Sequence, residues 1–189
     1  MLVNKGVVPD NAALVFSQAQ IEERVQELAA AIAKDFPGQR IVLVGVLTGA
    51  ALFTVDLARA LVQCGIHDIR IAFLSVSSYR KGSHRDQVRI DLDLKFSIQD
   101  EIVILVEDII DSGYTLRAIL KLLSAKDPKI VKTAVMFAKQ GNLAVSSTDA
   151  PVDYLGLVLP DNLWGIGYGL DVDEKFRLAP DVWGIPPQV

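Results

Sequence analysis

The sequence predicts an α/β fold in which a mainly parallel, twisted sheet is flanked by helices. Short apolar runs rich in Val, Ile and Leu recur along the chain, as expected for parallel strands that are buried on both faces. Segments with apolar residues at helical spacing follow several of these runs, and glycine-containing turns join them. Strands that alternate with helices form a sheet covered on both faces. The 189 residues, of which 51% are hydrophobic, are enough for one such domain.

Two predicted helices flank the first predicted buried strand. The first helix covers residues 17–36 and begins with the Ser-x-x-Gln pattern of a capping box. The strand covers residues 41–47, and the turn Thr48-Gly49 leads from it into the second helix, which ends at Gly65. Strand, tight turn and helix therefore follow one another as in a parallel α/β sheet.

A hairpin is predicted next. Residues 69–76 form an apolar strand, and residues 77–86 are polar, contain glycine and carry several positive charges, which predicts a mobile loop. Residues 88–94 alternate between apolar and polar side chains, the pattern of a strand with one solvated face. We therefore expect this strand to pair antiparallel with the one before the loop.

Acidic residues and a glycine turn follow the apolar strand over residues 102–106. The sequence there reads Glu107, Asp108, Ile109, Ile110, Asp111, Ser112, Gly113, Tyr114 and Thr115. Thr115 is the predicted N-cap of the next helix, because apolar residues at helical spacing follow it. Free backbone N–H groups at such a helix start bind phosphate. The acids would repel a phosphate, so we expect them to bind sugar hydroxyls or Mg2+, which implies a phosphorylated sugar as ligand.

The remaining sequence predicts two more strands and a non-periodic segment after them. The strands cover residues 130–138, followed by Lys139, and residues 154–158. Residues 160–171 are rich in glycine and aromatic side chains, which indicates a hood over the site. We predict a single domain, 1–189, with a core of about 17–158 and a C-terminal hood of about 159–189.

Composition excludes several classes of function. The net charge of -4 and the lack of a Lys/Arg-rich run argue against a nucleic-acid partner. No apolar run is long enough to span a membrane or to serve as a signal peptide, so we expect a cytoplasmic protein without a membrane partner.

The string from Glu107 to Thr115 resembles the 5-phosphoribosyl 1-pyrophosphate motif of the type I phosphoribosyltransferases. Its Glu-Asp-Ile-Ile-Asp-Ser-Gly form is similar to that of the hypoxanthine-guanine branch. Further matches are Leu47-Thr48-Gly49, Ser78-Tyr79, Lys139, the stretch from Pro160 to Asp171, and Arg177. The resemblance therefore covers most of the chain beyond the first helix, and it implies the type I phosphoribosyltransferase fold with a flexible hairpin loop and a small hood.

The resemblance also implies a role for each matching residue. On the sugar side, Asp111 would be the catalytic base, Glu107 and Asp108 would bind ribose, and Asp111, Ser112, Gly113, Tyr114 and Thr115 would hold the 5′-phosphate. Thr48, Gly49 and Arg177 would bind pyrophosphate, and Ser78 and Tyr79 would belong to the closing loop. On the base side, Lys139, Trp164 and Gly165 would bind the purine. Asp171, Glu107 and Asp108 would hold Mg2+.

The implied activity is purine salvage, in which hypoxanthine or guanine displaces pyrophosphate from 5-phosphoribosyl 1-pyrophosphate to give IMP or GMP with Mg2+. The implied assembly is a homodimer or homotetramer. A regulatory protein that senses the ribosyl pyrophosphate, or a transferase for another base such as xanthine, would use the same phosphate loop. The sequence departs from the family pattern at Thr48, where lysine is common, and at Tyr114, whose role stays open.

Overall fold

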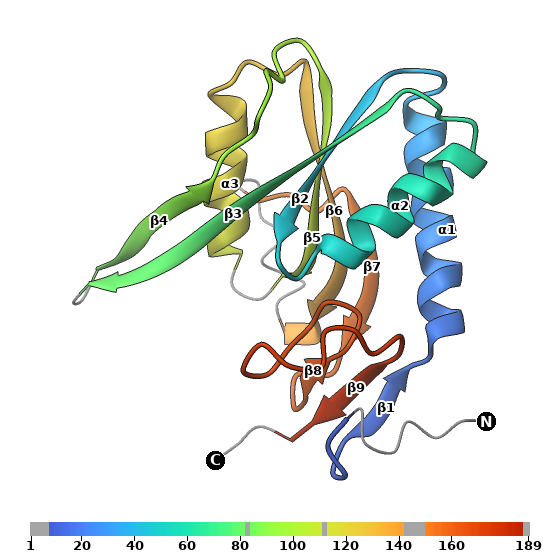
Figure 1. The fold of residues 1–189 in the computed structure, drawn as a ribbon, viewed down its shortest axis with the longest axis vertical. Coiled ribbons are helices and arrows are strands. Elements are labelled where there is room, and N and C mark those ends of the chain that lie inside the picture. The colour runs from blue at the N-terminus through green and yellow to red at the C-terminus, as the bar shows by residue number, and fades with distance from the viewer. Residues whose placement is uncertain (1–7, 82–83, 111–112, 142–149, 187–189) are drawn as a thin grey trace.

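A computed structural model describes residues 8–81, 84–110, 113–141 and 150–186 of the chain. A six-stranded sheet lies between helices, and a smaller sheet lies beyond one end of it (Figure 1). The elements in chain order are β1 (Ala13–Phe16), α1 (Gln18–Asp35), β2 (Ile41–Leu47), α2 (Ala51–Gln63), β3 (Ile69–Lys81), β4 (His84–Leu92), β5 (Ile102–Ile110), α3 (Tyr114–Ser124), β6 (Ile130–Lys139), β7 (Tyr154–Leu159), β8 (Trp164–Ile166) and β9 (Val182–Ile185).

The large sheet has the strand order β4-β3-β2-β5-β6-β7. Strands β3, β2, β5, β6 and β7 run parallel, and only β4 at the edge runs antiparallel to its neighbour β3. The prediction of a mainly parallel sheet is therefore confirmed. Because β2, β5 and β6 are adjacent and parallel, the segments that follow them emerge side by side at one edge of the sheet.

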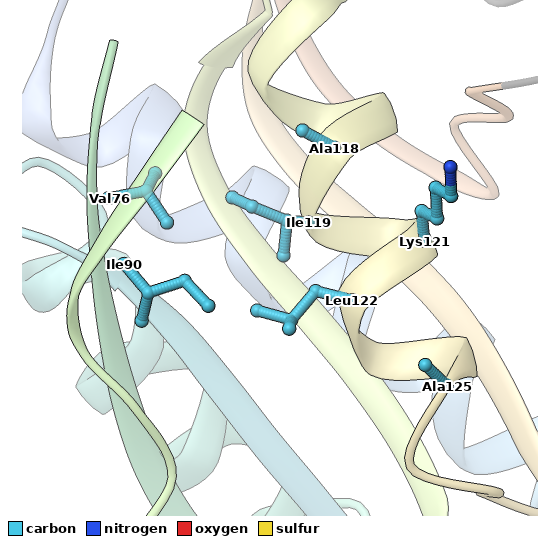
Figure 2. Close-up of a pocket in the computed structure, with 7 residues that line it drawn as sticks. All are labelled: Val76, Ile90, Ala118, Ile119, Lys121, Leu122 and Ala125. Atoms are coloured by element: carbon cyan, nitrogen blue, oxygen red, sulfur yellow. The ribbon is translucent and has the colours of Figure 1, made fainter. Parts of the chain in front are cut away.

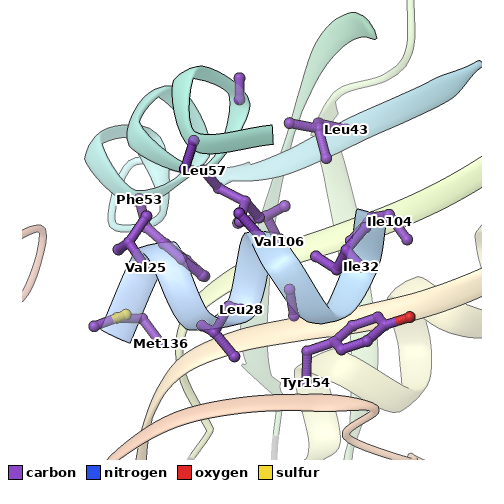
Figure 3. Close-up of a cluster of buried hydrophobic side chains, with 14 of the residues drawn as sticks. Val25, Leu28, Ile32, Leu43, Phe53, Leu57, Ile104, Val106, Met136 and Tyr154 are labelled. Atoms are coloured by element: carbon purple, nitrogen blue, oxygen red, sulfur yellow. The ribbon is translucent and has the colours of Figure 1, made fainter. Parts of the chain in front are cut away.

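Both faces of the sheet are buried, as the apolar runs predict. In β5, Ile104 and Val106 pack in the cluster with α1 and α2, whereas Val103 and Leu105 pack in the cluster with α3. Successive side chains of a strand point to opposite faces, so a continuous apolar run fills both clusters. Figure 3 shows the first cluster, in which side chains of α1 and α2 lie over those of the strands.

Helix α1 begins as predicted and also covers an edge of the sheet. The backbone N–H of Ser17 donates to Gln20 Oε1 at 2.9 Å, and the Ser17 hydroxyl accepts from the Gln20 N–H, so the capping box is present. The Arg24 guanidinium donates to two carbonyls of the edge strand β7, those of Leu155 and Gly156. No helix in the described ranges is both long and apolar enough to cross a membrane.

The hairpin has longer strands than predicted. Residues 77–86, predicted as a loop, lie largely in β3 and β4, and the backbone of Ser78 pairs with that of Val88. The antiparallel pairing itself is confirmed. The alternating pattern begins only at Val88, and residues 84–87 of β4 are all polar. Cross-strand backbone pairing toward the tip of the hairpin holds these polar residues in a ladder, which composition alone assigned to a loop.

The smaller sheet, here called the hood sheet, consists of β1, β9 and β8 in that order. Both neighbours of β9 run antiparallel to it, with Leu14 opposite Trp183 and Gly165 opposite Gly184. The hood therefore includes a strand from the amino-terminal part of the chain, which the sequence did not predict. Its attachment to α1 includes a hydrogen bond of 2.8 Å from the Gln18 N–H to the Asp181 carboxylate.

Candidate active site

The candidate site lies where three adjacent strands of the large sheet end. The turn Thr48-Gly49 follows β2, Glu107 and Asp108 lie near the end of β5, and Lys139 is the last residue of β6. Ligands of parallel α/β sheets bind outside this edge. The structure therefore brings together residues that the sequence assigned to a sugar phosphate and to a base.

Glu107 is buried at the end of β5, with 9% of its surface exposed. The sequence placed it in a loop, but it continues the strand and pairs with Val135 of β6. Its Oε2 atom has no hydrogen-bond partner in the part of the chain that the structure describes. Burial, and the nearby charge of Asp108, raise the pKa of the Glu107 carboxyl well above its ordinary value. A buried oxygen of this kind is suited to a ligand hydroxyl or cation.

The neighbouring Asp108 carboxyl has its pKa raised to about 6. Burial is the main cause, hydrogen bonds from backbone N–H groups oppose it, and the positive charge of Arg177 also lowers the pKa. The negative charge of Asp171 raises it. Asp108 thus lies within electrostatic reach of both hood residues, and at neutral pH its charged form favours a ligand with hydroxyl groups or a metal.

Glycine is required at two positions where the β2 turn meets its neighbours. A Cβ atom at Gly49 would lie 1.8 Å from Asp108 Oδ2, and a Cβ atom at Gly169 would lie 2.1 Å from the Gly49 carbonyl oxygen. Gly169 also has a φ of +96°, which favours glycine. The Leu47–Thr48 peptide bond before the turn is cis. The β2 turn, the end of β5 and the hood are therefore in direct contact.

Arg177 and Asp171 form an ion pair in the hood, with 2.8 Å between Arg177 Nη2 and Asp171 Oδ1. The other carboxylate oxygen of Asp171 accepts from the Glu174 N–H at 2.8 Å. Arg177 Nη1 donates to the Gly169 carbonyl at 2.7 Å. The two residues that the sequence assigned to pyrophosphate and Mg2+ are therefore joined to each other and to the glycine that packs on the β2 turn.

A cavity of about 130 Å³ lies between the strand ends and the hood. Its lining consists of Asp108, Ile109, Lys139, Trp164, Gly165, Leu170 and Asp171. Lys139 Nζ is 5.1 Å from the centroid of the Trp164 ring, and the Trp164 side chain is half exposed. The apolar members Ile109 and Leu170 were not predicted as site residues. Their positions next to Asp108 and Asp171 in the sequence were the available signal.

The segment that was predicted to bind the 5′-phosphate leads into helix α3. Gly113 is its N-cap, with a φ of 70°, and Tyr114 is the first helical residue, so the prediction of Thr115 as N-cap was wrong. Among the residues that the structure describes, no side chain caps this helix start. Glycine adopts the left-handed conformation that the sharp turn requires, whereas threonine is strained there. The first backbone N–H groups of the helix therefore have no acceptor among the described side chains, and they suit an anion.

Several predicted residues are placed only in part. Asp111 and Ser112 lie outside the described residues, so their roles stay predictions. Ser78 and Tyr79 are described through their backbone, in β3. Their roles in a closing loop also stay predictions.

The carboxylates of the site fit Mg2+ that is shared with a substrate. Mg2+ is usually held by one or two carboxylates together with substrate phosphates, rather than by a complete protein cage. Within the described ranges, no three His, Cys, Asp or Glu side chains gather as a metal site. Asp108 and Asp171 nevertheless line the same cavity, and Glu107 presents a buried oxygen that has no partner among the described residues. This donor set fits the shared mode.

A larger cavity, of about 360 Å³, lies elsewhere, between the β3–β4 hairpin and α3 (Figure 2). Figure 2 shows Val76 and Ile90 facing Ile119 and Leu122 across it. Among the described residues that line it, Lys121 is the one that carries a charge. Because no described carboxylate lines it and it lies apart from the carboxyl ends of β2, β5 and β6, this cavity is not the candidate site.

Comparison with known proteins agrees with this geometry. The model of the phosphoribosyl transferase domain family matches residues 15–173. A hypoxanthine-guanine phosphoribosyltransferase from Dictyostelium discoideum is 37% identical over 169 residues, covering 88% of this chain and 91% of the relative. One from Aquifex aeolicus is 37% identical over 172 residues, covering 90% and 92%. The solved structure of Trypanosoma cruzi hypoxanthine phosphoribosyltransferase with the product IMP superposes with a TM-score of 0.85, at 34% identity, and covers 96% of this chain and 98% of that one.

Proposed function

The chain belongs to the phosphoribosyl transferase domain family, and we propose that it is the purine-salvage enzyme that transfers a ribosyl 5-phosphate group to hypoxanthine or guanine. The relatives at 37% identity, which carry that enzyme name, match the chain over most of their length. The resemblance noted from residues 107–115 to this family is therefore confirmed. The donor would be 5-phosphoribosyl 1-pyrophosphate, and the products would be IMP or GMP and pyrophosphate.

The observation that carries this proposal is the cavity at the strand ends. It gathers an acid of β5, the terminal lysine of β6, and an aromatic and an acid of the hood: Asp108, Lys139, Trp164 and Asp171. These residues come from distant parts of the sequence. They are the residues proposed to bind the sugar and pyrophosphate of one substrate and the purine base of the other. A solvated surface loop would not require such convergence.

Glu107 and Asp108 are proposed to hold the ribose hydroxyls. Glu107 has the buried oxygen without a described partner, and Asp108 faces the cavity. Both groups would then fix the ring while its carbon 1 bond to pyrophosphate breaks. Positive charge that develops on the ribose is stabilised by carboxylates already oriented toward it. The start of α3 at Tyr114 is proposed to hold the 5′-phosphate through backbone N–H groups.

The pyrophosphate is proposed to lie between the β2 turn and Arg177. The absence of a side chain at Gly49 lets the backbone come close to a bound group, and Arg177 contributes positive charge nearby. Asp108 and Asp171, with Glu107, are proposed to hold Mg2+. When bound there, Mg2+ would neutralise charge on the departing pyrophosphate.

The purine is proposed to stack on Trp164, with Lys139 donating to the 6-oxo group and Gly165 offering its backbone. Trp164 and Lys139 both line the cavity, with the ammonium already near the indole ring. Asp111, at the start of the phosphate turn, is proposed as the base that accepts the proton from purine nitrogen 7. Ser78 and Tyr79 are proposed to belong to the hairpin that closes over this site.

The wider properties remain part of the proposal. We expect one domain, a cytoplasmic location, and a homodimer or homotetramer with no nucleic-acid or membrane partner. A solved relative from Trypanosoma cruzi is described in terms of how its C-terminal region affects oligomeric state and activity, so the assembly of this chain should be measured on the full chain.

The direct test is a screen of hypoxanthine, guanine, xanthine and adenine with the ribosyl pyrophosphate and Mg2+, following nucleotide formation. We expect conversion of at least one 6-oxopurine, and loss of conversion when Mg2+ is removed by chelation. Tight binding of the ribosyl pyrophosphate without turnover of any base would favour a sensor instead. Turnover of xanthine alone would change the assigned base but not the reaction.

A further inference from the structure

The indole of Trp164 joins the purine end of the candidate site to its pyrophosphate end. Its ring lines the cavity, and its Nε1–H donates to the backbone carbonyl of Asp171 at 3.0 Å. We propose that Trp164 is a positioning residue for pyrophosphate, and that it acts through this hydrogen bond in addition to its ring face. The inference rests on the proposed function, because it takes Asp171 and Arg177 as the pyrophosphate end.

Asp171 is held from three directions in the hood. Its Oδ1 pairs with Arg177, its Oδ2 accepts from the Glu174 N–H, and its backbone carbonyl accepts from Trp164. The first two contacts come from the segment that follows Asp171 in the sequence. Trp164 lies on β8, so among these contacts it alone ties Asp171 to the hood sheet.

The segment after Asp171 depends on such contacts because its backbone conformation is energetically unfavourable. Asp173, Glu174 and Phe176 all have positive φ values, of 52°, 60° and 71°. Residues with a side chain adopt this conformation at an energetic cost and keep it only where their surroundings fix them. Arg177 follows directly, and it pairs with Asp171 and donates to Gly169. Releasing the Asp171 carbonyl therefore loosens the segment that orients Arg177.

The two contributions of Trp164 can be separated by chemistry. Phenylalanine keeps an aromatic face for the purine but has no N–H group. Trp164→Phe should therefore spare stacking and weaken pyrophosphate binding. A hydrogen bond of this kind is worth roughly a two- to tenfold change in an equilibrium constant.

The experiment measures two affinities by isothermal titration calorimetry on the full-length protein: that for pyrophosphate with Mg2+, and that for IMP. In Trp164→Phe we expect the pyrophosphate Kd to rise by about two- to tenfold and the IMP Kd to change less than the pyrophosphate Kd. Trp164→Tyr, which also lacks the indole N–H, repeats the test if the first variant does not fold. Trp183→Phe is the matched control, since Trp183 lies on β9 of the same sheet and its Nε1 has no partner in the described part of the chain. It should leave both affinities unchanged.

Fluorescence gives a second readout. The chain contains two tryptophans, so Trp183→Phe leaves Trp164 as the sole indole. Pyrophosphate with Mg2+ should change its emission, because the N–H partner belongs to the residue at the binding end. Binding without any emission change, an unchanged pyrophosphate Kd in Trp164→Phe, or an equal loss of both affinities would overturn the inference. Wild-type protein that forms no nucleotide and binds neither compound would instead refute the proposed function.

Discussion

Gly49 and Asp108 lie so close together that a side chain at position 49 would displace the carboxylate. A Cβ atom built on Gly49 falls 1.8 Å from Asp108 Oδ2 and 2.4 Å from Asp108 Cγ. The turn after β2 therefore defines where an acid of β5 points. Because the proposed pyrophosphate and ribose subsites meet at this contact, one methyl group should disturb both.

We expect Gly49→Ala to weaken binding of the ribosyl pyrophosphate by at least about tenfold, the equivalent of about 1.4 kcal/mol. The added methyl group forces Asp108 or the turn to move. Titration calorimetry measures the affinity. Gly38→Ala is a suitable control, because Gly38 has no heavy atom within 4 Å of its added Cβ and lies away from the strand ends. Its positive φ of +64° should lower stability without changing ligand affinity. Unchanged affinity in Gly49→Ala would contradict the proposed pyrophosphate turn.

Asp108→Asn should stabilise the ligand-free protein at neutral pH. The pKa of Asp108 is about 6 in the folded protein, above its ordinary 3.8, so between these values the folded state holds a proton that the unfolded chain has released. Folding stability therefore falls as pH rises through this window, and the full penalty is present above about pH 6.

Asparagine carries no charge and avoids that penalty. The free energy of unfolding of the variant should therefore exceed that of the wild type by on the order of 1 to 3 kcal/mol at neutral pH. The difference should shrink toward zero below about pH 4. Thermal unfolding across this pH range measures it, and a gap that is constant with pH would contradict the assignment. Turnover should fall in the same variant, because a carboxylate that is proposed to bind ribose and Mg2+ is lost.

Lys139→Ala should reduce selectivity for 6-oxopurines over adenine. A fixed ammonium donates to a 6-oxo acceptor, whereas it meets a donor in the adenine amino group and leaves polar groups unmatched. We expect kcat/KM for hypoxanthine to fall by roughly ten- to several-hundredfold, since a hydrogen bond to a charged group is lost. The value for adenine should change little. Lys132→Ala is the control on the same strand, because Lys132 pairs with Asp153 and is not part of the cavity lining.

Asp111→Asn should lower turnover by roughly 10^2 to 10^4, the usual contribution of a general base. Asparagine keeps the size of the side chain and removes its basicity. Binding of the ribosyl pyrophosphate should change much less, because backbone amides, Glu107 and Asp108 are proposed to carry it. Single-turnover kinetics and titration calorimetry separate the two effects. Near-normal turnover would refute the base assignment, and complete loss of sugar-phosphate binding would make Asp111 a structural brace of the loop.

Much of the site was predictable because its residues follow strongly patterned elements. The apolar run before Glu107 predicts a buried strand, and Lys139 ends another, so their meeting at one sheet edge follows from parallel pairing. The capping box at Ser17 was equally local. In each case neighbouring residues in the sequence contain the whole signal.

The features that were not predicted depend on distant partners. Strand β1 has four residues and gains its structure by pairing with β9, more than 160 residues away in the sequence. The polar strands at the tip of the hairpin exist because each supplies the other with hydrogen bonds. At α3, both Gly113 and Thr115 are acceptable N-cap residues by preference, and the tightness of the turn decides for glycine.

The order of strands in the hood sheet affects when the site can form during synthesis of the chain. Its middle strand, β9, comes from residues 182–185, whereas the strand that carries Trp164 and the strand near the start of the chain do not pair with each other. A nascent chain that has emerged only as far as β8 contains every strand of the large sheet, but it lacks β9, the strand with which both outer strands of the hood sheet pair. The proposed stacking platform for the purine is therefore completed after the proposed sugar-phosphate end, and a ribosome-bound chain should acquire affinity for the ribosyl 5-phosphate before it distinguishes between bases.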